Sequence, residues 1–188
     1  MEYKINSPVD KAALAQLRAG DRVLLSGAVY TARDAAHKRL IELLDKGEKL
    51  PFELEGSVLY YVGPTPEAPG QVIGSAGPTT SGRMDAYSPR LLELGQPVMI
   101  GKGSRNREVV DAIVRNGAVY LAAMGGAGAL IGACVQSVKL VCWEDLGCEA
   151  VRLLEVKDMP LMVAIDSHGG NIYESGPAAY IDSLKRGK

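Results

Sequence analysis

The chain has 188 residues, a length that predicts a single domain over residues 1–188. Hydrophobic residues make up 47% and charged residues 23%, values that exclude a disordered tail, a collagen-like chain and a coiled coil. Lys and Arg number 21 against 22 Asp and Glu, and the resulting formal charge of -1 argues against nucleic acid as the main partner.

The chain also lacks the patterns of a membrane or secreted protein. No apolar run approaches the ~18 residues of a membrane span, and the first residues do not form a signal peptide. Cys134, Cys142 and Cys148 are odd in number and no pair has CxxC spacing, which disfavours a disulfide framework and a metal or iron–sulfur site within this chain. We therefore expect a cytoplasmic protein with reduced thiols.

Hydrophobic periodicity predicts alternating helices and strands, with strands in excess. The expected helices run from Ser7-Pro8 to about Leu17, from Asp34 to Gly47, over Met84–Leu94 with Pro89 kinking or restarting it, from Ser104 to about Arg115, from the glycines of 125–132 onward, and over Pro177–Lys185. The expected strands are Arg22–Tyr30, Ser57–Val62, Gln71–Ser75, Pro97–Ile100, Gly117–Met124, Val135–Trp143, Val151–Val156 and Leu161–Asp166. This order predicts one compact α/β domain, with ligands bound at the carboxyl ends of strands.

Arg33 lies at one such strand-to-helix junction, in the segment Tyr30–Lys38. An arginine just ahead of a helix offers a planar fork to a carboxylate, beside the free backbone N–H groups of the first turn. The alternative is an ordinary surface pair between Arg33 and Asp34 or another nearby acid.

The segment Gly77–Arg83 has the composition of an anion-binding loop. Two glycines and a proline fix an irregular backbone, three consecutive hydroxyl residues (Thr79, Thr80, Ser81) line it, and Arg83 closes it. A loop that merely turns the chain could carry the same residues.

Lys102 stands between two glycines after a predicted buried strand, which suggests close approach of a ligand or, equally, a tight turn with a solvated lysine. The segment lacks the spacing of a phosphate loop. The glycines of 125–132 miss the dinucleotide pattern, so packing of a helix on the sheet is their better interpretation. Asp166-Ser167-His168 is not a catalytic triad, because triads are assembled from separated segments. The two histidines, His37 and His168, are too few for a histidine-based metal site.

Arg33, Arg83 and Lys102 together indicate a site for a small di- or tricarboxylate. A strong acid/base pair and a metal site, which would act on such a substrate, are missing. The residues therefore predict half of an active site.

Several of these strings, in this order, resemble the iron–sulfur-dependent class I fumarate hydratases and the related L-tartrate dehydratases. They are Thr31–Lys38, Gly77–Asp85, Gly101–Gly103, Met124–Leu130 and the stretch from Trp143–Gly147 to Asp158–Pro160. The resemblance is to the C-terminal domain or separate beta subunit of that family, and it covers about residues 25–173. Each string alone is weak, but their combination is specific.

The resemblance implies a swivelling β/β/α-type domain that closes over an alpha subunit, and the alpha subunit carries a [4Fe–4S] cluster. It implies that Arg33, Arg83 and Lys102 clamp the substrate carboxylates and that Thr79 lies at the reacting carbon as the base, either directly or through a relay. On this basis we expect a hydro-lyase beta subunit that interconverts (S)-malate and fumarate only together with its alpha subunit, and that binds no cofactor itself.

Two alternatives to fumarate hydratase remain open. L-tartrate differs from malate by one hydroxyl, so the chain could instead be the beta subunit of L-tartrate dehydratase. A non-catalytic carboxylate-binding module of the same fold is the other alternative, although the complete set of Arg33, Thr79, Arg83 and Lys102 argues against it. An isolated chain could also form a homodimer through the face that normally meets the alpha subunit.

Overall fold

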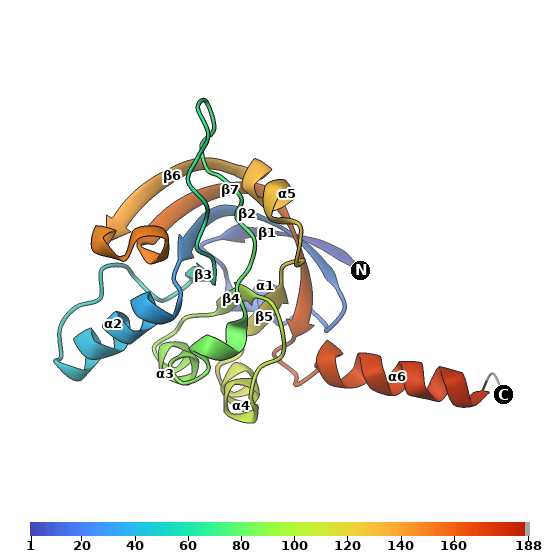
Figure 1. The fold of residues 1–188 in the computed structure, drawn as a ribbon. Coiled ribbons are helices and arrows are strands. Elements are labelled where there is room, and N and C mark those ends of the chain that lie inside the picture. Colours follow the sequence, from blue (N-terminus) through green and yellow to red (C-terminus); the bar gives the residue numbers. More distant parts are fainter. Residues whose placement is uncertain (187–188) are drawn as a thin grey trace.

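The computed structural model describes residues 1–186, which form one seven-stranded sheet with helices packed against it (Figure 1). The strands are β1 (Glu2–Ser7), β2 (Arg22–Thr31), β3 (Val58–Tyr60), β4 (Val98–Gly101), β5 (Val119–Ala122), β6 (Val135–Cys142) and β7 (Val151–Ile165). The helices are α1 (Lys11–Leu14), α2 (Asp34–Asp45), α3 (Ser88–Glu93), α4 (Arg107–Asn116), α5 (Gly128–Ala133) and α6 (Ile172–Arg186), with short 3₁₀ helices η1 (Ser81–Met84) and η2 (Glu144–Glu149). The α/β class predicted from the sequence is confirmed.

The sheet closes on itself like a barrel, which periodicity alone does not predict. Its strand order is β1-β2-β3-β4-β5-β7-β6, and β2 pairs in addition with β7. The strands β1 to β5 run parallel to one another, whereas β7 runs antiparallel to β2, β5 and β6. Strands β2, β3, β4, β5 and β7 therefore form a ring, with β1 and β6 attached outside it.

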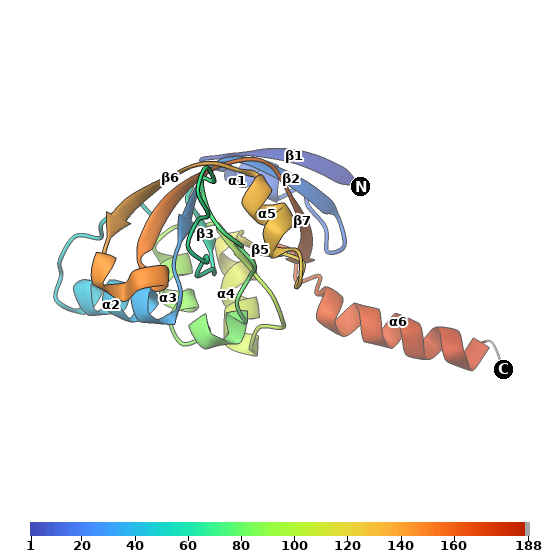
Figure 2. The ribbon, with the colours of Figure 1, turned by 45° about the horizontal axis from the view of Figure 1, so that its top comes forward.

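Alternating residues of the central strands supply two separate hydrophobic cores. Tyr60, Ile100 and Leu121 belong to one core with α1 and most of β7. Their neighbours Leu59 and Met99 belong to the other core, which also includes residues of α2, α3 and α4. These three helices lie together on one side of the sheet (Figure 2). This period of two is what buried strands impose, because successive side chains point to opposite faces.

Two predicted helix starts are wrong in the same way, because a different polar side chain caps the helix. Asp10, rather than Ser7, caps α1, accepting a bond from the Ala12 amide, and residues 2–7 form a strand instead. Asn106, rather than Ser104, caps α4, accepting from the Val109 amide. A third start is shifted by one residue: Asp34, predicted to cap its helix, is the first residue of α2, and Arg33 in the N-cap position makes no side-chain capping bond.

The remaining differences concern strands and prolines. Gln71–Ser75 forms no strand, and Pro89 restarts the chain as α3 after η1. The two strands expected over Val151–Asp166 are halves of the single strand β7, joined where its pairing with β2 shifts register. Helix α6 begins at Ile172, before Pro177, and extends away from the rest of the domain without a buried residue (Figures 1 and 2).

Candidate active site

Three adjacent parallel strands end at the same edge of the sheet, and predicted site residues follow two of them. Thr31 at the end of β2 pairs with Tyr60 at the end of β3, and Tyr60 pairs with Ile100 in β4. Arg33 follows β2 and Lys102 follows β4 directly. The carboxyl edge of this sheet is therefore where the predicted substrate clamp is located, as expected for an α/β fold.

Thr79 reaches this edge although it lies nineteen residues beyond Tyr60, the last residue of β3. The chain leaves β3, makes the excursion 63–77, and returns so that Pro78 pairs with Val62. The Thr79 amide then donates to the Tyr61 carbonyl oxygen at 2.8 Å, and Thr79 accepts from the Lys102 amide at 3.3 Å. The backbones of Thr79 and Lys102 are thus adjacent, which sequence spacing does not reveal.

The Arg33 side chain extends from the start of α2 to Gly63, just after β3. Its guanidinium lies 3.1 Å from Glu149 Oε1 and 3.5 Å from Asp34 Oδ1, and a Cβ atom at Gly63 would come within 2.9 Å of Arg33 Nη1. Arg33 Nε is buried and has no partner in residues 1–186. The guanidinium is therefore positioned but not saturated.

Glu149 is a site neighbour that the sequence analysis missed. Its Oε2 accepts from the Ala35 amide at 3.3 Å, while Oε1 meets Arg33, so the carboxylate lies at the N-terminus of α2. A carboxylate at that place matches the positive end of the helix dipole. Glu149 lies within the stretch from Trp143 to Pro160 that carries part of the family resemblance, but no spacing rule singles it out.

Arg83 and Lys102 are the free cations of the site. Both side chains are exposed, and neither forms an ion pair with any carboxylate in the described residues. Arg83 lies in η1, four residues after Thr79. The structure thus brings together Thr79 and Lys102 and leaves the Arg83 side chain open to solvent.

Two hydrogen-bonded hydroxyl groups, those of Ser81 and Tyr120, connect the Thr79 loop with the segment that follows β4. The Tyr120 hydroxyl donates to the Gly103 carbonyl oxygen at 2.9 Å, and the Ser81 hydroxyl, 2.8 Å away, donates to the Tyr120 oxygen. Burial raises the pKa of Tyr120 well above its ordinary value, so this phenol stays protonated and remains a donor. The Ser81 amide also donates to the Lys102 carbonyl oxygen at 2.9 Å.

His37 is completely buried beside Arg33 on α2. Its Nδ1 donates to the Arg33 carbonyl oxygen at 2.9 Å, which leaves Nε2 as an acceptor without a partner in residues 1–186. Burial lowers the pKa of His37 to about 4, further lowered by Arg105, with the Arg33 bond and Asp34 acting in the opposite direction. The ring is therefore neutral at pH 7 and serves the structure around Arg33.

This pKa makes the stability of the domain depend on pH. The unfolded ring, with a pKa of 6.5, binds a proton at a higher pH than the folded ring. The free energy of unfolding should therefore fall as the pH drops from 6.5 to 4, by about 3 kcal/mol from this residue. Urea titrations should show a shallower pH dependence for His37→Phe. A variant of the exposed histidine, His168→Asn, should keep the wild-type dependence, and an unchanged slope in His37→Phe would contradict the assignment.

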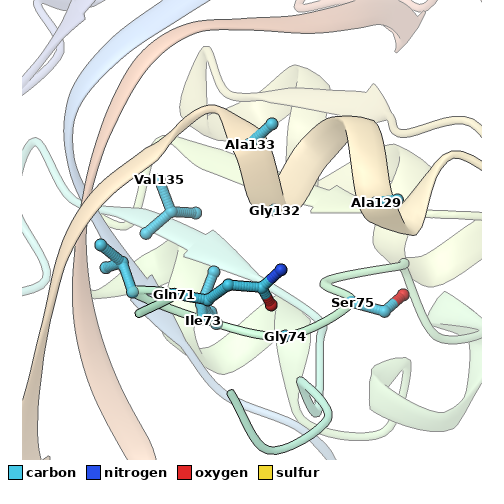
Figure 3. A pocket seen from close by; sticks show the side chains of 9 residues that line it. Gln71, Ile73, Gly74, Ser75, Ala129, Gly132, Ala133 and Val135 are labelled. Carbon is cyan, nitrogen blue, oxygen red and sulfur yellow. The ribbon is translucent and has the colours of Figure 1, made fainter. Parts of the chain in front are cut away.

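The cavity in Figure 3 is separate from these residues. It has a volume of about 300 Å³ and lies between the segment 71–75 and α5. Its polar side chains are Gln71 and Ser75, and it has no charged lining residue. Such a lining cannot neutralise a dicarboxylate, so the exposed edge with Arg33, Thr79, Arg83 and Lys102 is the better candidate.

Residues 1–186 contain no group of three His, Cys, Asp or Glu side chains that could hold a metal ion. Cys134, Cys142 and Cys148 are free thiols, and the first two have pKa values raised by burial, which disfavours the thiolate that a cluster needs. The donors present here therefore do not fit an iron–sulfur cluster. In the same part of the chain, no helix has the length and apolar character to cross a membrane.

The sequence of this chain also matches a known protein family. The family described as Fumarase C-terminus matches residues 1–176. The chain belongs to the fumarase C-terminus family. This confirms the family resemblance drawn from the five sequence strings.

Relatives within this family fall into two kinds by length. The chain is 37% identical over 177 residues to Fumarate hydratase 2 of Leishmania major, covering 92% of this chain and 31% of that protein. It is 36% identical over 174 residues to the aerobic class I fumarate hydratase of Escherichia coli, covering 90% of this chain and 32% of that protein. The chain thus spans about a third of the fumarate hydratases it matches.

The other kind is matched over nearly its full length. The chain is 43% identical over 180 residues to the "Putative L(+)-tartrate dehydratase subunit beta" of Methanocaldococcus jannaschii, covering 93% of this chain and 92% of that protein. Both names describe hydro-lyases, so the enzyme class of the family agrees with the class predicted from the sequence.

Proposed function

We propose that this chain is the beta-type part of a hydro-lyase that interconverts (S)-malate and fumarate plus water. The observation that carries the proposal is the junction of Thr79 and Lys102 at the carboxyl edge of the sheet, the edge at which Arg33 follows β2. A hydroxyl and a free cation held by backbone hydrogen bonds form a rigid platform for a carboxylate substrate. Membership of the fumarase C-terminus family supports the same reaction class.

The side chains of this site divide the work of binding. Arg83 offers a planar fork that can bind a carboxylate with two parallel hydrogen bonds, and Lys102 offers a point charge. Arg33 offers the part of its guanidinium that Glu149 and Asp34 do not engage. Together, three cations can hold the two carboxylates of malate at a fixed spacing. The same cations stabilise the negative charge that grows on the adjacent carboxylate as a proton leaves carbon.

Thr79 is the residue that we assign to proton transfer from the substrate carbon. Dehydration of malate breaks a C–H bond and the C–O bond of the hydroxyl, and the proton and hydroxide leave together as water. A threonine hydroxyl is a weak base at its ordinary pKa, so Thr79 needs the nearby Lys102 charge or a relay to an acid on the partner. We therefore assign Thr79 as a positioned proton carrier and not as an unaided base.

The site needs a second chain or domain for activity, because the four residues lie on an open edge. The family resemblance implies a [4Fe–4S] cluster on an alpha subunit, and the fumarate hydratases matched here are about three times longer than the matched segment. We propose that the partner of this chain is such a cluster-bearing alpha subunit.

The experiment is an anaerobic assay of fumarate hydration by this chain, alone and then mixed with an alpha subunit whose cluster is verified by spectroscopy. We expect activity in the mixture and none from the chain alone. An inactive mixture with an intact cluster would overturn fumarate hydratase as the function.

L-tartrate dehydratase is the second candidate, favoured by the match over 92% of the tartrate dehydratase beta subunit. The same mixture should then dehydrate L-tartrate in preference to malate. A mixture that turns over neither acid, but binds a dicarboxylate to this chain, would instead support a binding module.

A further inference from the structure

A buried ion pair lies directly beneath the two loops that carry Arg83 and Lys102. Asp85 follows Arg83 by two residues and Arg105 follows Lys102 by three. The two form an ion pair in which Arg105 Nε donates to Asp85 Oδ1 at 2.6 Å. The Arg105 side chain is fully buried.

The guanidinium of Arg105 is held on all sides. Its Nη2 donates to Ser88 Oγ at 2.7 Å, and Nη1 lies 3.3 Å from the Met99 sulfur. The group also lies over the rings of Tyr61 and Tyr120, at 5.4 and 5.1 Å from their centres. Such cation–π contacts strengthen when the charge is removed from water. The fork therefore has one defined orientation.

The carboxylate of Asp85 connects both loops at once. One oxygen accepts from Arg105, and Oδ2 accepts from the Asn106 amide at 2.7 Å, at the start of α4. A single side chain from the end of η1 thus fixes the segment that follows Lys102. The Ser81–Tyr120–Gly103 hydrogen bonds and the Ser81–Lys102 backbone bond join the same two segments nearer to the surface.

We propose that Asp85 and Arg105 are positioning residues that set the spacing between Arg83 and Lys102 for a dicarboxylate. The inference rests on the proposed function. A buried ion pair is a poor means of stabilising a core, because an apolar pair of the same volume is often at least as stable. What the apolar pair lacks is the directed fork, which holds the two loops in one register.

Replacing both charged residues with apolar ones should therefore keep the stability and lose the directed fork. The double variant Asp85→Leu/Arg105→Met leaves no unpaired buried charge and should fold with a melting temperature near that of the wild type. In the enzyme assembled with its alpha subunit, it should raise KM for fumarate roughly tenfold or more, because a small misplacement of binding groups weakens substrate binding strongly. The matched control, Glu93→Gln/Arg115→Gln, removes an exposed ion pair between α3 and α4 and should keep wild-type KM.

A second readout does not depend on catalysis. In the isolated full chain, amide hydrogen exchange in residues 79–83 and 101–103 should be faster in the double variant, while strands β4 and β5 keep their protection. If the wild-type enzyme has no hydro-lyase activity, the proposed function fails, and hydrogen exchange still tests the positioning role.

Three results would contradict the positioning role of Asp85 and Arg105. A folded double variant with wild-type KM, or with unchanged exchange in both loops, would overturn the proposal. If the double variant does not fold, Arg105→Lys replaces it: this variant keeps the charge and loses the fork, and wild-type KM in Arg105→Lys would likewise overturn the proposal.

Discussion

We expect Arg83→Lys to lower kcat/KM for fumarate hydration by roughly 10- to 100-fold while leaving the fold unchanged. Lysine keeps the charge but replaces a planar fork with a point charge, so one of two charged hydrogen bonds to a substrate carboxylate is lost. Because Arg83 is exposed and makes no ion pair in residues 1–186, its replacement removes no internal support. The measurement is steady-state kinetics of the assembled enzyme, with circular dichroism to confirm folding.

Arg107→Lys is the matched control for this substitution. Arg107 is 81% exposed and pairs with Asp111 on its own helix, outside the candidate site. Kinetics equal to wild type in both variants would remove Arg83 from the site. An equal loss in both would indicate a general sensitivity to arginine replacement and not a role in substrate binding.

Gly101→Ala should have the largest effect on the loops themselves. A Cβ atom at residue 101 would clash with Ser81 Oγ and come within 3.0 Å of Tyr61 Cδ2. Strand β4 must therefore end in a residue without a side chain for Ser81 to reach Tyr120. We expect the free energy of unfolding to fall by about 1–3 kcal/mol, the usual cost of overpacking, and kcat/KM to fall with it.

The control for Gly101→Ala lies in the opposing loop. A Cβ atom at Gly82 would meet no atom within 4 Å, so Gly82→Ala should unfold at the wild-type urea midpoint. Wild-type stability in Gly101→Ala would show that Ser81 can move aside without cost, and it would remove the argument that this contact fixes the Thr79 loop.

Strong periodicity made much of the fold predictable. The 3.6-residue pattern placed α2 and α4 within a few residues of their observed bounds, and short apolar runs located β4 and β5. These elements bury one face or both, so hydrophobic pattern and structure agree. Helix starts were less predictable, because Ser104 and Asn106 are both good caps and only the surrounding packing selects Asn106.

Long-range pairing explains what the sequence could not predict. Pro160 suggested a break between two strands, but β7 passes through it, paired with Leu24 of β2. The register shift just before it bends the strand, which lets one strand pair with β6 and β2 first and with β2 and β5 afterwards. No local pattern encodes this closure of the ring.

The residues of the candidate site could likewise be predicted only in part from the sequence. Arg33, Arg83 and Lys102 could be proposed from residue type and from their positions near strand ends, whereas Thr79 was implied by the family resemblance. All four stay predictions. Asp85 and Arg105 could not, because twenty residues separate them and a charged residue in a helical pattern is usually solvated. Their burial follows from the return of the chain after residue 77, which only the folded structure reveals.

The ring of strands also bears on how copies of this chain behave in concentrated solution. In the described part of the sheet, the strands with an open side are β1 and β6, at its two ends. Both carry exposed polar or charged residues there, including Lys4 on β1 and Lys139 on β6. Lysines on terminal strands oppose edge-to-edge pairing with a strand of another molecule. The closed ring therefore limits aggregation through intermolecular β-sheet to two strands, and each of these is protected by charge.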